Sequence, residues 1–128
     1  MKLGDLKTNE ELLAAQLADP AFRAEWQRTA LARAVALRLV RYRAELGLSQ
    51  RDLAELLEMK QPQVARLERG DVNPGLETLM RLSGALDIEF TIDVRPANRN
   101  ARLVTRRAQD GALASYATDR AVALVSAA

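Results

Sequence analysis

The chain has no cysteine and no histidine among its 128 residues. Without cysteine there are no disulfides and no thiol nucleophiles. Without histidine the usual general base is missing, and the commonest zinc ligands are absent altogether. The six glycines are scattered at predicted turns, so no glycine-rich phosphate loop is present. We therefore expect a protein that is not an enzyme and that holds neither a metal nor a cofactor.

Aromatic residues and long apolar runs are also scarce. The sequence has one Trp, two Tyr and two Phe, and it contains no window of about 18 apolar residues. The first residues, MKLGDLKTNEELL, include acidic side chains where a signal peptide needs an apolar core. These absences predict a cytoplasmic protein with no membrane span. Because Ala and Leu dominate the apolar residues, closely packed helices are expected.

The stretch from Leu48 to Gly70 carries the strongest pattern in the chain. Ser49 and Asp52 form a predicted capping box at the start of one helix, and Gln61-Pro62 starts another that Gly70 ends. With so few residues between them, two short helices must cross steeply, as in a helix-turn-helix. The apolar or small residues that would seal the angle between them are Leu53, Ala54, Leu57, Met59, Val64 and Leu67.

The outward positions around the second helix share one chemistry. All are hydrogen-bond donors and none is acidic: Lys60, Gln61, Gln63, Arg66 and Arg69. Donor-rich side chains on an exposed helix are typical of a protein that reads the major groove of DNA. The alternative is an αα-hairpin with a solvated polar face.

This stretch resembles the helix-turn-helix of the phage-repressor or Xre family. The resemblance covers about residues 31–87 through the patterns S-Q-x-x-L-A from Ser49, Q-x-x-V-x-R-L-E-x-G from Gln61 and N-P-x-L-x-T-L from Asn73. It implies an all-α fold with a five-helix repressor-like domain over residues 29–94. Two positions depart from the family pattern: Glu58 stands where glycine is usual at the turn, and Pro62 replaces a polar position.

The expected DNA contacts divide into two groups. We expect Gln61, Gln63 and Arg66 to read bases, since Arg suits guanine and Gln suits adenine. Phosphates are assigned to Gln50, Lys60, Arg69 and Asn73, the last two because the resemblance implies it. Residues 29–94 contain nine basic and ten acidic side chains, so weak non-specific DNA binding is expected from this region.

Residues 1–28 form a predicted helical extension. A first helix ends near Leu17, Asp19-Pro20 starts another, and nothing interrupts the helical pattern from Ala21 to Leu46. Phe22 and Trp26 in this extension either fold back onto the chain or bind a partner protein. The segment LADPAFRAEW, ending at Trp26, resembles the front end of HigA-type antitoxins, which neutralise a HigB-type mRNA-cleaving toxin and repress their own operon.

Residues 89–94 alternate polar and apolar side chains and predict one strand, with Phe90, Ile92 and Val94 on one side. Since no other stretch pairs with it convincingly, we expect it to pair with the same strand of a second copy, or to lie as an irregular tail over the helix before it. Residues 95–128 are interpreted as a basic, Ala-rich tail that is either helical or disordered, with six basic and two acidic side chains.

The function expected from these observations is a homodimeric antitoxin that binds a pseudo-palindromic double-stranded operator and a small toxin protein. Two alternatives remain open. One is a stand-alone Xre-type repressor without a toxin partner. The other is a scaffold whose helix-turn-helix docks proteins instead of DNA.

Overall fold

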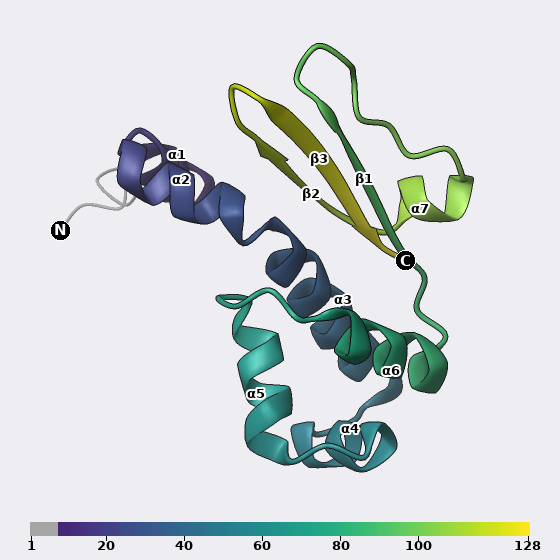
Figure 1. Cartoon of the computed structure of the whole chain (residues 1–128). Helices are drawn as coiled ribbons and strands as arrows, with labels where there is room; N and C mark the ends of the chain where they lie inside the picture. Colours follow the sequence, from purple (N-terminus) through teal and green to yellow (C-terminus); the bar gives the residue numbers. More distant parts are fainter. Residues whose placement is uncertain (1–7) are drawn as a thin grey trace, which may run out of the picture.

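The computed structural model describes residues 8–128. Within this range it has seven helices and three strands (Figure 1). The elements in chain order are α1 (Asn9–Leu17), α2 (Pro20–Arg28), α3 (Ala30–Leu46), α4 (Gln50–Leu57), α5 (Gln61–Arg69), α6 (Leu76–Leu86), β1 (Phe90–Pro96), α7 (Arg106–Asp110), β2 (Ala112–Ala117) and β3 (Ala121–Ala127). No helix in this range is both long and apolar enough to cross a membrane.

Side-chain caps mark the starts of α1, α2 and α4, and the starts predicted at Asp19-Pro20 and at Ser49 are confirmed. Thr8 and Glu11 form a capping box at α1, and the Asp19 carboxylate accepts the Ala21 N–H at the start of α2. At α4 the Ser49 hydroxyl accepts the Asp52 N–H, and the Asp52 carboxylate accepts the Ser49 N–H. Because these side chains satisfy backbone donors that the first turn leaves free, the local sequence fixes where each helix begins.

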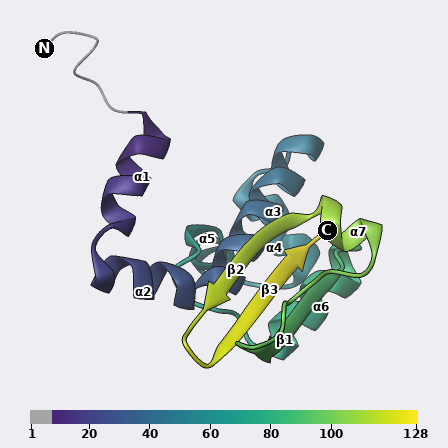
Figure 2. The ribbon, with the colours of Figure 1, turned by 90° about the horizontal axis from the view of Figure 1, so that it is seen from above.

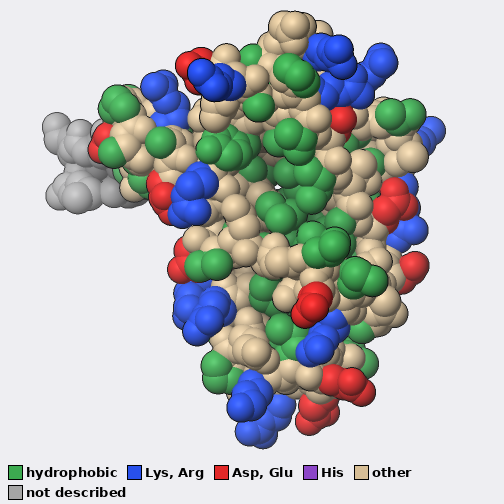
Figure 3. Space-filling view, viewed as in Figure 1, with side chains coloured by type: hydrophobic (Ala, Val, Ile, Leu, Met, Phe, Trp, Pro, Cys, Tyr) green, Lys and Arg blue, Asp and Glu red, His purple; other side chains and the backbone are tan. Residues whose placement is uncertain are grey.

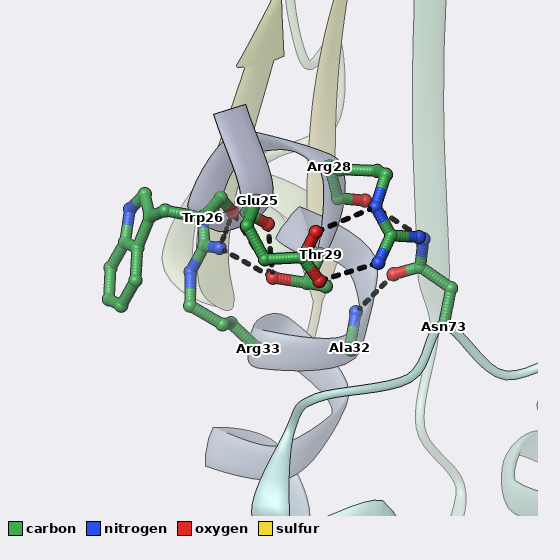
Figure 4. A network of polar contacts seen from close by, with 7 residues as sticks. All are labelled: Glu25, Trp26, Arg28, Thr29, Ala32, Arg33 and Asn73. Carbon is green, nitrogen blue, oxygen red and sulfur yellow. Dashed lines mark hydrogen bonds and ion pairs between the residues drawn. The ribbon is translucent and has the colours of Figure 1, made fainter. Parts of the chain in front are cut away.

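The prediction of an uninterrupted helix over residues 21–46 is wrong, because the helix is broken at Thr29. In a continuous helix the Ala32 N–H would bond to the Arg28 carbonyl. Here the side-chain amide of Asn73 takes both partners: its Oδ1 accepts from Ala32 at 3.0 Å and its Nδ2 donates to Arg28 at 2.9 Å (Figure 4). A side chain inserted into the backbone hydrogen-bond ladder bends a helix at that point. The result is two helices, α2 and α3, in place of one.

The core lies between α3, α4, α5 and α6 and extends under the sheet. Its fully buried large side chains include Leu39, Leu53, Leu57, Leu82 and Ile88. On α6 the side chains of Leu79, Leu82 and Leu86 are buried, but Leu76 and Met80, which belong to the same apolar stripe, are 73% and 66% exposed. The apolar stripe of α6 is therefore wider than the core it covers.

The single strand and unpaired tail expected after α6 are also wrong. Arg95 and Pro96 end β1, and residues 97–128 contain a loop, α7, β2 and β3. Strand β3 lies between β1 and β2 in an antiparallel sheet of order β1-β3-β2. Phe90 is opposite Ala127 and Pro96 is opposite Ala121, so β1 pairs along its whole length within its own chain. The residues 29–94 accordingly contain four helices and a strand, not five helices, and the fold is helical with a small sheet.

The sheet and the helix-turn-helix occupy opposite ends of α3. Figure 1 shows the sheet at the top, α4 and α5 at the bottom, and α3 running between them. Helices α1 and α2 lie to one side of the other elements, and α2 leads into α3 and lies next to β2 (Figure 2). Buried Ala112, Val125 and Ala127 of the sheet join the same hydrophobic cluster as the helices. The C-terminal strands thus complete the core that the helix-turn-helix begins.

Candidate nucleic-acid interface

Helices α4 and α5 form the predicted helix-turn-helix. Leu53, Ala54 and Leu57 of α4 and Val64 of α5 are all buried, with Ala54 4% exposed and Val64 fully covered. The small Ala54 side chain lets the two helices approach, and the larger ones fill the angle between them. Gly70 ends α5 in the left-handed conformation, at φ 68°. A Cβ added to Gly70 would lie 3.2 Å from the Ala36 Cβ, so this end of α5 lies tightly against α3.

The turn between α4 and α5 is built on Glu58 in the left-handed conformation, at φ 53° and ψ 42°. It is stabilised by the Met59 N–H, which bonds to the Ala54 carbonyl at 2.9 Å. A left-handed residue with a side chain costs about 1–2 kcal/mol relative to glycine. The departure from the family pattern at this position therefore adds backbone strain to the turn.

Replacing Glu58 by glycine is expected to raise the free energy of unfolding by about 1 kcal/mol, because the turn keeps its shape without the strain. Glu58→Ala is the matched control, since it removes the carboxylate but keeps a Cβ in the left-handed conformation. Chemical denaturation of the three proteins measures the effect. If Glu58→Gly is no more stable than Glu58→Ala, the left-handed conformation of residue 58 does not strain the turn.

The outward face of α5 is exposed as the sequence predicts. Lys60, Gln61, Gln63, Arg66 and Arg69 are all exposed, and the acidic residue of this helix, Glu68, has a side chain that is only 6% exposed. Gln61 and Arg66 make no side-chain hydrogen bond or ion pair with any described residue. Arg69 lies 3.8 Å from Asp71, with both side chains more than 60% exposed. An exposed pair of this kind contributes little, so Arg69 remains able to bind an anion.

Among the expected contact residues on α4 and α5, Gln50 and Gln63 already make side-chain hydrogen bonds within the chain. The Gln63 Oε1 accepts the Lys60 N–H at 3.0 Å, so its side chain caps the start of α5. The Gln50 Nε2 donates to the Glu68 carboxylate at 2.9 Å. Gln63 keeps its amide N–H groups for an acceptor such as a guanine or adenine N7. Because the Gln50 side chain bonds to Glu68, the group of Gln50 available to bind an anion is its backbone N–H in the first turn of α4.

A network that sequence analysis missed fixes the orientation of α5. Arg43 on α3 donates to both Glu68 carboxylate oxygens, through Nε at 2.6 Å and Nη2 at 2.9 Å, and to the Leu48 carbonyl at 3.1 Å. The Glu68 side chain is 6% exposed. Burial raises its pKa, but the hydrogen bonds from Arg43 and Gln50 outweigh that effect and hold the pKa below the ordinary value. The available signal was an acidic residue on a helix whose exposed side chains are otherwise donors.

The Asn73 side chain is exposed, but it already makes two hydrogen bonds within the chain. Both ends of its side-chain amide are used at the junction of α2 and α3. The sequence indicated a loop residue with a DNA role, whereas the structure gives it a position that holds two helices together. One amide N–H is left over, because an asparagine amide has two donors.

Phe22 and Trp26 are half-buried on α2. Their rings stack with centroids 6.2 Å apart, and the Arg33 guanidinium lies 3.9 Å from the centre of the Trp26 ring. The same Arg33 group donates hydrogen bonds to the Trp26 carbonyl and to the Thr29 hydroxyl (Figure 4). Trp26 and Leu113 of β2 also line the same two surface hollows. The inner side of this pair thus contacts its own chain, and the outer side stays accessible.

The comparisons with known proteins agree with this geometry. Residues 39–92 match the family model described as Helix-turn-helix. Over 54 residues the chain is 44% identical to a Haemophilus influenzae protein named "Uncharacterized HTH-type transcriptional regulator". That stretch covers 42% of this chain and 55% of the relative, so the chain spans about half the length of the curated protein it matches. No solved structure matches the chain significantly. Residues 39–92 thus form an Xre-type helix-turn-helix domain, and the outer elements lie beyond the matched region.

Proposed function

We propose that this protein is a sequence-specific DNA-binding transcriptional regulator that represses as a homodimer. The observation that carries the proposal is the exposed face of α5, which has no exposed acidic side chain and is held in place from behind by the partly buried Arg43–Glu68 pair. A rigid helix whose outward side chains are donors fits the acceptor-rich major groove. In a two-fold dimer, two such helices would enter successive major grooves about 34 Å apart, which implies a pseudo-palindromic operator.

Each exposed residue has a proposed role in that complex. Arg66 and Gln61 would contact base edges, and Gln63 would add a donor from its free amide group. Lys60, Arg69 and the backbone N–H of Gln50 would bind phosphates and set the register on the duplex. The bound Asn73 amide is not assigned a phosphate here, because both its ends already serve the α2–α3 junction.

The Arg66→Ala variant is expected to bind the operator more weakly by about 1.5 kcal/mol, which raises Kd roughly 10-fold. It is also expected to lose its sequence preference at one base pair of each half-site. Arg69→Ala is the matched control, because it removes a guanidinium assigned to phosphate. Binding assays against operator duplexes altered one base pair at a time provide the measurement. An equal loss on operator and random DNA would make Arg66 a phosphate contact.

Lys60→Gln is expected to weaken binding to all duplexes alike and to lower the slope of log K against log salt by about one unit. Lys60 caps the start of α5 through its backbone, so the substitution leaves that hydrogen bond in place. Titrations at several salt concentrations give the slope. An unchanged slope would place Lys60 outside the interface.

A second candidate function is that of a HigA-type antitoxin, which would also bind and neutralise a small HigB-type toxin. What favours it is the stacked Phe22–Trp26 pair on helix α2, to one side of the other elements (Figure 2). A stand-alone regulator fits the same observations equally well. Co-expression of the tagged chain with the product of the adjacent small reading frame separates the two. A stoichiometric complex with a growth-toxic partner, lost in Phe22→Ala/Trp26→Ala, supports the antitoxin, and a harmless neighbour that does not co-elute supports the stand-alone regulator.

A further inference from the structure

The outer edge of β1 combines unpaired backbone with exposed apolar side chains. In the β1–β3 ladder, Glu89 exchanges both backbone hydrogen bonds with Ala128, and Ala97 donates to Arg120. Because such bonds alternate along a strand, the N–H and C=O groups of Phe90, Ile92 and Val94 point the other way, to the outer edge. No described residue forms a backbone ladder with that edge, since β1 ends the sheet order β1-β3-β2.

The side chains next to this edge form an apolar surface. Ile92 and Val94 are 46% and 65% exposed, beside the exposed Leu76 and Met80 of α6. Leu76, Met80, Phe90 and Ile92 line a hollow of about 480 Å³ between α6 and β1. Figure 3 shows hydrophobic side chains across the middle of the molecule, between the sheet and the helices below it, with charged groups around the rim. An open strand edge beside exposed Leu, Met and Ile side chains is a place where another strand pairs.

We propose that a second copy of this chain occupies the edge, with β1 pairing antiparallel to the partner's β1 about a two-fold axis at Ile92. In this register Ile92 is opposite the partner's Ile92, and Phe90 is opposite the partner's Val94. All three outward N–H groups of each strand are then paired, and the two sheets become one of six strands. The proposal deepens the proposed function, because it names the partner surface of the repressor dimer.

The positions of charged residues favour this pairing register over the two registers shifted to a centre at residue 91 or residue 93. Centred on Ile92, the pairing places Glu89 opposite the partner's Arg95. Moving the centre to residue 91 would put Glu89 opposite the partner's Asp93, and moving it to 93 would put the two Asp93 carboxylates opposite each other. Like charges directly opposite destabilise a strand pair. The register centred on 93 would also place Pro96, which has no N–H, opposite the partner's Phe90.

The first test uses the natural absence of cysteine. Hydrogen-bonded residues across an antiparallel pair have Cα atoms about 5.5 Å apart, within disulfide range. Ile92→Cys is therefore expected to form a disulfide-linked dimer under mild oxidation at least roughly 10-fold faster than Leu113→Cys. Leu113 is the matched control because it is 51% exposed on β2, the strand at the other edge of the sheet. Equal cross-linking rates for the two variants would overturn the proposal.

The second test measures assembly in solution without DNA. The wild-type chain is expected to be a dimer by light scattering, and Ile92→Lys is expected to raise the dimer Kd on the order of 100-fold, since two ammonium groups would meet at the axis. Arg95→Glu should weaken the dimer, and Arg95→Glu with Glu89→Arg should restore it. A monomeric wild type, or a double variant no better than the single one, contradicts the proposal. Because no DNA is present, a failure to bind DNA leaves these readouts unaffected.

Discussion

Glu68→Gln is expected to lower the free energy of unfolding by about 3 kcal/mol. The substitution removes the carboxylate that accepts two hydrogen bonds from Arg43 and one from Gln50, and the Glu68 side chain is 6% exposed. Breaking a buried ion pair from one side costs about 3–5 kcal/mol, because the remaining charge has lost its partner. The lower end applies here, since the Arg43 side chain is 23% exposed. Urea denaturation measures the loss, with the exposed Glu55→Gln on α4 as control.

The stability difference between the wild type and Glu68→Gln is also expected to depend on pH. The folded-state pKa of Glu68 lies below its ordinary value of 4.5, so its contribution to stability is fully present above that value and is lost as the pH falls through the lower, folded-state pKa. The difference in stability between wild type and Glu68→Gln should therefore shrink in acid. The Asp52 and Asp93 pKa values are also lowered, but both groups are present in the two proteins and cancel in the difference. A difference that is constant from pH 7 to pH 3 would contradict this role of Glu68.

Asn73→Ala is expected to lower the free energy of unfolding by about 2 kcal/mol, roughly 1 kcal/mol for each hydrogen bond lost at the α2–α3 junction. Without the amide, the Ala32 N–H and the Arg28 carbonyl are free to bond to each other, and α2 can extend α3 as a straight helix. That change would move Trp26 away from Leu113 of β2. Because Trp26 is the single Trp in the sequence, its fluorescence reports the movement directly.

The expected signal in Asn73→Ala is a red-shifted Trp26 emission at pH 7, with helical content by circular dichroism unchanged or slightly raised. Asn98→Ala is the control, because Asn98 is exposed and its side chain makes no hydrogen bond with a described residue. Unchanged emission and unchanged stability in Asn73→Ala would show that other contacts hold α2 at its angle.

Local patterns in the sequence predicted the helix-turn-helix well. The Ser49–Asp52 capping box, the buried positions Leu53, Leu57 and Val64, and the stop at Gly70 all depend on residues close together in the chain. Short-range hydrogen bonds and the helical repeat can be predicted from the sequence without knowledge of the tertiary packing. The donor-rich face of α5 follows from the same repeat, and its exposure is confirmed.

The wrong predictions, of an uninterrupted helix and of a single strand, concern features that depend on contacts between distant parts of the chain. Asn73 breaks a helix 41 residues before it, which no local pattern reveals. The pairing of β1 with β3 joins Phe90 to Ala127, and β2 and β3 are Ala-rich stretches whose composition favours helix. Tertiary pairing overrode that preference, because β1 alone would leave its backbone groups unpaired. The exposure of Leu76 and Met80 could not be predicted either, because helical periodicity shows an apolar stripe but not the width of the surface that covers it.

The most direct test of DNA reading by α5 is to select duplexes from a random library with the full chain and to compare affinities by fluorescence anisotropy at one salt concentration. We expect a palindromic consensus, bound at least about 10³-fold more tightly than a scrambled duplex. We also expect that Gln61→Ala/Arg66→Ala loses most of that ratio while keeping non-specific binding. Equal affinity for the selected and scrambled duplexes, or a ratio unchanged in the double variant, would contradict the proposal that α5 reads DNA.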